Sequence, residues 1–210
     1  MTLRTILTSV AVVGISLGIP SPARAHRLDE LLQATLLSID RDQVTVEITL
    51  TAGTSLAAQV FASIDTNGDG RISAAEGHAY ARGVLNTVQL SVDALPAILT
   101  VNDYQFPDLH QMSLGVGTIR LRATAKIPPA AVGPHHLYFH NMHQPESSVY
   151  LVNALVPTDH QIRIGEQRRD GEQRSLTLDY SVVPGESWAQ GLWLIAGLVA
   201  MGAASRAWRF

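Results

Sequence analysis

The chain has 210 residues, 46% of them hydrophobic, no cysteine and a formal net charge of -3. This length fits one domain with its own core, and the lack of cysteine excludes disulfides, zinc-thiolate sites, iron–sulfur clusters and a cysteine nucleophile. The acidic balance offers no basic surface for displacing counterions from phosphates, so nucleic acid is not an expected partner.

The first 25 residues have the pattern of a secretory signal peptide. Arg4 is the only charge before an apolar run over 6–19, and a cleavage site of the Ala-x-Ala type ends at Ala25. An uncleaved membrane anchor is the alternative, but the run is shorter than the roughly 20 residues that a spanning helix needs. We therefore expect residues 1–25 to be removed on export.

Residues 26–184 are predicted to form a mainly β domain, either a sandwich or a barrel. Apolar side chains at every second position from Val44 to Leu50 follow a polar turn at 40–43, which predicts a hairpin over 35–51. Further strands are expected at Val88–Val92, Ile98–Val101, Thr118–Ala125, His136–Asn141, Val149–Leu155, Gln161–Ile164 and Leu176–Val182.

The period changes within residues 54–86, where two short helices are expected as an insert in the β domain. Apolar residues recur there at helical spacing, three and four apart. They are Leu56, Val60, Phe61 and Ile64 in the first helix, and Tyr80, Ala81, Val84 and Leu85 in the second.

The link between these helices, residues 65–76, carries the pattern of a calcium-binding loop. Such a loop needs oxygen ligands at positions 1, 3, 5, 7, 9 and 12, and a glycine at position 6 where the chain turns with positive φ. The ligands in that order are Asp65, Asn67, Asp69, Arg71 through its backbone carbonyl, Ser73 and Glu76. Gly70 holds position 6 and the apolar Ile72 holds position 8.

On these residues the segment resembles the EF-hand family, which implies Ca²⁺ as the cofactor. A polar turn that binds no ion is the alternative. EF-hands usually occur in pairs, and the sequence contains no second loop with the required glycine and spacing. A lone hand implies weak binding, on the order of 10⁻⁴–10⁻³ M, and a structural role for the ion. Another chain or a strand of the β domain must then contact Ile72.

Gly77 departs from a good helix-forming sequence, because it lies inside the second helix. Glycine in a helix interior costs about 1 kcal/mol relative to alanine, so we expect it to soften this helix.

The C-terminal residues 185–210 are expected to form a transmembrane anchor. Only Gln190 is polar in residues 188–204, and Arg206 and Arg209 follow, which predicts a helix of about bilayer length with its basic end in the cytoplasm. A buried amphipathic helix is the alternative. The tail also resembles, loosely, bacterial C-terminal sorting tails.

Small residues recur within this apolar segment at every fourth position. They are Ala196, Ala200 and Ala204. Such a stripe lets two membrane helices approach closely, so a homodimer is one expected partner arrangement.

Without the two ends the domain is clearly acidic. Residues 26–184 contain 11 basic and 17 acidic side chains, a net charge of -6. Such a surface is compatible with cation binding and with ordinary solubility. Together, the two ends predict an exported protein of the bacterial inner membrane, with the domain on the periplasmic, extracytoplasmic side.

The eight histidines raise the possibility of a second metal site. Imidazole and thioether ligands suit copper, and imidazole also suits nickel. The candidates are His26, His136, His140 and His143, with His110 close to Met112 in sequence and with Met142 between the last two histidines. His26 would begin the mature chain, and in this it resembles periplasmic copper carriers. Ordinary surface histidines are the alternative.

Two functions follow. The first is a calcium-binding, membrane-anchored extracytoplasmic domain with a structural or interaction role. The second is an accessory module that handles copper, nickel or cobalt for a membrane transport system and has a membrane-protein partner. The second is suggested because residues 140–157 resemble uncharacterised bacterial extracytoplasmic domains, some of which precede membrane domains of nickel/cobalt-exporter type. An enzyme is not expected, since the sequence has no nucleophile elbow, HExxH, P-loop or GxGxxG motif.

Overall fold

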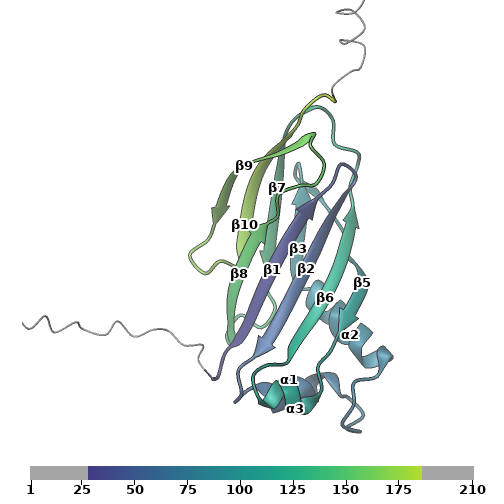
Figure 1. The fold of residues 1–210 in the computed structure, drawn as a ribbon, viewed down its shortest axis with the longest axis vertical. Helices are drawn as coiled ribbons and strands as arrows, with labels where there is room; N and C mark the ends of the chain where they lie inside the picture. Colours follow the sequence, from purple (N-terminus) through teal and green to yellow (C-terminus); the bar gives the residue numbers. More distant parts are fainter. Residues whose placement is uncertain (1–27, 186–210) are drawn as a thin grey trace, which may run out of the picture.

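The computed structural model describes residues 28–185, so the expected signal peptide and nearly all of the expected C-terminal anchor lie outside it (Figure 1). The mainly β prediction is confirmed. The elements are β1 (Leu31–Ile39), β2 (Gln43–Ala52), α1 (Ala57–Ile64), α2 (Ala74–Leu85), β3 (Val88–Val92), β4 (Leu95–Pro96), β5 (Thr100–Gln105), α3 (Leu109–Ser113), β6 (Thr118–Lys126), β7 (Gly133–Asn141), β8 (Ser148–Ala154), β9 (Ile162–Arg169) and β10 (Ser175–Val182). None of the helices in this range has the length and apolar character to cross a membrane.

The strands form two five-stranded sheets. The order is β5-β6-β2-β1-β8 in the first sheet and β4-β3-β7-β10-β9 in the second. Among the strands within residues 28–185, β1 and β8 alone run parallel, from Leu31 opposite Ser148 to Leu37 opposite Ala154. A parallel pair needs a long crossover connection. Here the crossover includes the helices and strands of both sheets, so the β1–β8 pair ties distant parts of the chain together.

The predicted hairpin is confirmed as β1 and β2, which pair from Leu31 opposite Ala52 to Ile39 opposite Val44. Strand β1 begins at Leu31, earlier than the expected position 35. The inward positions near its start include two polar residues, Gln33 and Thr35, which interrupt the apolar alternation that marks a strand.

Several other predicted boundaries are wrong. Strand β5 begins at Thr100 and not at the expected Ile98. Ile98 is largely exposed and lies before the strand. Strand β9 continues to Arg169, well past Ile164. It lies at a sheet edge, where a strand needs few apolar residues and polar ones protect against aggregation. The two-residue β4 and the five-residue α3 were not predicted, since neither is long enough to show a period.

Both sheets contribute to one hydrophobic core. The residues at every second position of β2, from Val44 to Leu50, are almost fully buried, as the alternation predicts. Phe139 of β7 and Leu178 of β10 supply the opposite side of the core. Helix α1 adds Phe61 to the same cluster. The helical insert is therefore part of the folded core and not a separate unit.

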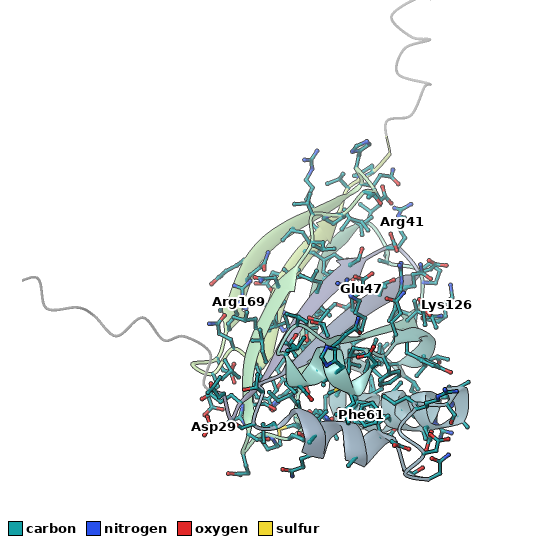
Figure 2. The ribbon with its side chains drawn as sticks, turned by 60° about the horizontal axis from the view of Figure 1, so that its bottom comes forward. Asp29, Arg41, Glu47, Phe61, Lys126 and Arg169 are labelled. Atoms are coloured by element: carbon teal, nitrogen blue, oxygen red, sulfur yellow. The ribbon has the colours of Figure 1, made fainter. Side chains whose placement is uncertain are left out.

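The three helices gather at one end of the sheets, and the β1–β2 turn lies at the other (Figure 1). Figure 2 labels Phe61 of α1 and Arg41 of that turn towards these opposite ends. Helix α1 starts a few residues after Ala52, which pairs with the first residue of β1. The chain thus turns into the helices where the first hairpin ends. We call these the helical end and the turn end.

Arg169 connects the edge strands of the two sheets. Its Nε donates to the carbonyl of Val152 in β8 at 2.7 Å, and its Nη2 donates to Asn153 Oδ1 at 2.7 Å. Strand β9, which carries Arg169, is the edge of the second sheet, and β8 is the edge of the first. The side chain therefore occupies a backbone acceptor of β8 that would otherwise be open to pairing with another strand.

A buried polar network joins the sheets near the helical end. Gln33 of β1, with no exposed surface, donates to the carbonyl of His143 at 2.6 Å and to Ser148 Oγ at 2.7 Å. Gln33 Oε1 accepts from Asn141 Nδ2 of β7 at 2.9 Å, and the Tyr150 hydroxyl donates to the His143 carbonyl at 2.7 Å. Buried polar groups are stable only when they are paired in this way.

Because of this network, replacing Gln33 by an apolar side chain of similar size should clearly lower the stability of the domain. Gln33→Leu should lower the free energy of unfolding by about 1–3 kcal/mol, because Asn141 Nδ2 loses its acceptor in a buried site. The matched control, Gln59→Leu, places the same change on an exposed position of α1 and should alter stability by about 0.5 kcal/mol or less. Equal losses in urea unfolding of the two variants would contradict the structural role of Gln33.

Candidate functional site

The helix–loop–helix arrangement predicted for residues 54–86 is present. Helix α1 ends at Ile64, and α2 begins at Ala74, so α2 includes Gly77 as expected as well as the apolar stretch from Tyr80. The start of α2 is set by a capping box. Ser73 Oγ accepts from the Glu76 N–H at 3.3 Å, and the Glu76 carboxylate accepts from the Ser73 N–H at 3.0 Å.

The first half of the loop is a turn held by its own side chains. Asp65 accepts from the Gly70 N–H at 2.8 Å and from the Asp69 N–H at 3.2 Å. Asn67 Oδ1 accepts from the Asp69 N–H at 2.9 Å, and Asp69 Oδ1 accepts from the Arg71 N–H at 2.9 Å. Side-chain oxygens at alternate positions therefore face the backbone of a single tight turn.

Gly70 stands where this turn needs a left-handed backbone. Its φ is +79°, in the region that residues with a Cβ rarely adopt. The expected reason for glycine at position 6 is thereby confirmed. Gly68, at position 4, also has positive φ, +71°.

Glu76 joins the start of the loop to the start of α2. Its Oε1 accepts from the Thr66 hydroxyl at 3.0 Å and from the Asn67 N–H at 3.1 Å, and its Oε2 accepts from the N–H and the hydroxyl of Ser73 at 3.0 and 2.8 Å. The hydrogen bonds from Ser73, followed by those from Asn67 and Thr66, hold the pKa of Glu76 at about 2, below its ordinary 4.5. The carboxylate is thus ionised at neutral pH, and protons do not compete for it.

The six predicted ligands lie together in this one loop but differ in their exposure. Asp65 and Glu76 are each 9% exposed, whereas Asn67, Asp69, Arg71 and Ser73 are at the surface. Their oxygens come from carboxylates, an amide, a hydroxyl and a backbone carbonyl, which is the donor chemistry that calcium prefers. In this respect the residues fit the ion.

The carboxylates are not gathered around one point. Within residues 28–185, no three His, Asp or Glu side chains form a group that could hold a metal ion. Asp65, Asp69 and Glu76 each accept hydrogen bonds from backbone N–H groups of the loop. A bound cation would therefore have to replace some of these hydrogen bonds.

The position-8 residue, Ile72, packs against the core of its own chain. It is half-buried and contacts the hydrophobic cluster of the β domain. The core cluster of the same chain thus supplies an apolar contact for Ile72, and that cluster includes residues of α1 and α2 as well as of the strands. The contact is apolar packing, since Ile72 belongs to none of the described strands.

Gly77 has a packing role that the sequence alone does not reveal. A Cβ at this position would lie 2.8 Å from Cε2 of Phe106 and 3.0 Å from Cε2 of Tyr104. The Tyr104 hydroxyl also donates to the carbonyl of Ala74 at 2.9 Å. Helix α2 therefore docks closely on two aromatic rings at the end of β5, and glycine permits this approach.

A matched pair of alanine substitutions in α2 separates packing from helix propensity. Gly83→Ala should stabilise the protein by up to about 1 kcal/mol, because a Cβ there meets no atom within 4 Å. Gly77→Ala should lose that gain or destabilise, since the two rings must move. The measurement is urea unfolding of both variants. Equal stabilisation by both would show that the rings do not restrict Gly77.

The candidate histidines of a second metal site have separate partners. His136 Nδ1 lies 2.7 Å from Asp179 Oδ1, and His140 Nδ1 lies 3.0 Å from the Tyr138 hydroxyl. His26 lies outside the described residues, and His110 and Met112 are in α3. The structure therefore does not bring His136, His140 and His143 together as a set of ligands.

His143 lies against the helical insert. Its Nε2 is 3.4 Å from the hydroxyl of Tyr80 in α2, and the two rings meet edge to face. Burial lowers the pKa of His143 to about 4 and raises the pKa of Tyr80 to about 12. Both groups are therefore neutral near pH 7, and they form part of the contact between α2 and the polar network of the sheets.

One ordered polar pair was missed by the sequence reasoning. His135 Nδ1 lies 2.7 Å from Asp93 Oδ2, and its Nε2 lies 2.7 Å from the carbonyl of Ala131. These contacts, that of Ala131 first, raise the pKa of His135. Asp93 and Ala94 form the β3–β4 turn with φ values of +50° and +64°. Asp93 suits the first position of such a turn, but Ala94 stands where glycine is usual, so the local signal was incomplete.

Comparisons with protein-family models, curated proteins and solved structures found no match to this chain. The assignment of the candidate site rests on residues 65–76 themselves.

Proposed function

We propose that residues 65–76 bind one Ca²⁺ ion and that the ion orders the helical end of an exported, membrane-anchored domain. The domain then has a structural or interaction role. The observation that carries this proposal is the turn around Gly70, where Asp65, Asn67 and Asp69 present oxygens at alternate positions. A turn of this kind, followed by a carboxylate at position 12, is the arrangement that calcium loops use.

The hydrogen bonds of Glu76 support weak binding. An ionised carboxylate has about four acceptor sites, and Glu76 already accepts four hydrogen bonds. Coordination by both oxygens would exchange some of these bonds for bonds to the ion. We therefore expect a dissociation constant on the order of 10⁻⁴–10⁻³ M, which suits an extracytoplasmic site exposed to millimolar calcium.

The helices on either side connect the loop to the core. Helix α1 buries Phe61 and Ile64, and α2 buries Val84 and Leu85, all in the one hydrophobic cluster. An ion that holds the two helix ends in place therefore acts on the stability of the whole domain. At a calcium concentration ten times the dissociation constant, mass action adds about 1.4 kcal/mol to the free energy of unfolding.

The proposed membrane attachment is supported by sequence only. The apolar residues 188–204 and the basic Arg206 and Arg209 suit a spanning segment with its basic end in the cytoplasm.

The alternative function in copper, nickel or cobalt handling gains no support from His136, His140 and His143, which have separate partners.

Thermal unfolding of the full chain in detergent tests the calcium proposal. Calcium at about 10 mM should raise the melting temperature by about 3–6 °C relative to a chelator at equal ionic strength. Glu76→Gln should abolish the shift. Glutamine at this position keeps the capping box with its one oxygen but gives up the hydrogen bonds from Thr66 and Asn67, so the variant is expected to fold with a lower melting temperature.

Glu146→Gln is the matched control. It removes the same charge from an exposed residue between β7 and β8 and should leave the calcium shift intact. The proposal fails if calcium produces no shift in the natural sequence, or if the shift survives in Glu76→Gln.

A further inference from the structure

We propose that the turn end of the domain rests on the bilayer surface, with the loops 127–132 and 155–161 in contact with lipid. This inference rests on the proposed membrane attachment and says which face of the domain meets the membrane. It does not depend on calcium binding.

The strand registers place both loops at the turn end. Lys126, before the first loop, pairs with Gln43 at the β1–β2 turn, and Ala154, before the second, pairs with Leu37. The described chain also finishes at this end, since β10 runs to Val182 beside the start of β7. Figure 1 shows these loops and the end of the described chain together at the top, away from the helices.

The two loops expose apolar side chains. Val156 is 88% exposed, Val132 is 59% exposed and Leu155 is 43% exposed. Pro128 and Pro129 of the first loop are also exposed. The strand registers put these side chains at the same end of the domain, and larger exposed apolar surfaces commonly mark contacts with a membrane or a protein, whereas single exposed residues are ordinary.

Both loops are fixed to the domain by hydrogen bonds. The Ala130 N–H donates to the Arg41 carbonyl at 2.7 Å, and His135 holds the carbonyl of Ala131. The Val183 N–H donates to the Gln161 carbonyl at 2.7 Å, which ties the departing chain to the second loop. The apolar side chains are thus presented by ordered backbone, so contact with lipid needs little further ordering.

Charged side chains stand beside the first loop. Lys126 Nζ lies 3.8 Å from Asp42 Oδ2 and donates to Gln43 Oε1 at 3.1 Å. Both side chains of this pair are largely exposed, so they would face the polar headgroups of lipid.

The course of the chain selects this end over the helical end. Exposed apolar residues also occur at the helical end, where Leu114 and Val116 follow α3, so exposure alone does not decide. Only Glu186 and Ser187 stand between Gly185 and the apolar segment that starts at Trp188. Three residues of extended chain span at most about 11 Å. An apolar segment that enters the bilayer therefore keeps the turn end near its surface.

The orientation has a consequence for the calcium loop. Nine-residue strands such as β1 and β6 span roughly 30 Å at about 3.3 Å per residue. Residues 65–76 lie beyond the far end of these strands, so the loop faces away from the membrane.

Fluorescent labels at single cysteines test the orientation, because the natural chain has no cysteine to interfere. The full chain is reconstituted in phosphatidylcholine vesicles that contain a lipid with a nitroxide on its headgroup. Val132→Cys and Val156→Cys report on the turn end. Val149→Cys, an identical substitution opposite Leu32, and Gln59→Cys in α1 report on the helical end.

The labels at Val132 and Val156 should be quenched by the nitroxide at least about twofold more strongly than those at Val149 and Gln59, because quenching falls steeply over the length of the strands. Equal quenching at all four positions, or stronger quenching at the helical end, overturns the proposal. Protection of the Val132 and Val156 labels from aqueous iodide without lipid quenching also overturns it and indicates a protein contact, such as a second copy of the chain.

Flotation of the same vesicles tests membrane attachment separately from the orientation of the domain. A chain that floats with the vesicles but shows no difference between the labels keeps its membrane attachment and loses only the proposed orientation. A chain that does not float loses both. Neither result bears on the calcium-dependent melting temperature.

Discussion

The carboxylate of Glu76 holds the helical end of the molecule together. It accepts hydrogen bonds from Thr66 and Asn67 at the start of the loop and from Ser73 at the start of α2. The same contacts close the capping box that begins α2. The position of α2 then brings Tyr80 against His143. One side chain therefore links the loop, the second helix and, through that helix, the polar network between the sheets.

Glu76 is a structural residue and also the strongest candidate ligand, and the same hydrogen bonds account for both roles. An oxygen that already binds backbone N–H groups is held in place before any ion arrives, and its low pKa, about 2, keeps it ionised. The same hydrogen bonds would oppose the proposed ion, since coordination would have to displace some of them. Pre-ordering and competition together favour a site that binds weakly and changes stability, which suits a structural ion better than a fast signal.

Local sequence patterns predicted the hairpin, the two longer helices and the loop. Each of these elements has a period or a residue spacing that is visible within a short stretch of the chain. Features that depend on distant partners could not be predicted. The pairing of His136 with Asp179 and the approach of Phe106 to Gly77 join parts of the chain that are far apart in sequence. The start of β1 was hidden because the buried Gln33 is polar, and its partner, Asn141, lies in another sheet.

Direct counting of bound calcium tests the central claim. Equilibrium dialysis of the full chain over a calcium range up to about 10 mM should give one ion per chain, with a dissociation constant on the order of 10⁻⁴–10⁻³ M. The bound ion should be absent from Glu76→Gln. No bound calcium in the natural sequence, or one ion per chain retained by Glu76→Gln, would contradict the assignment of residues 65–76 as the site.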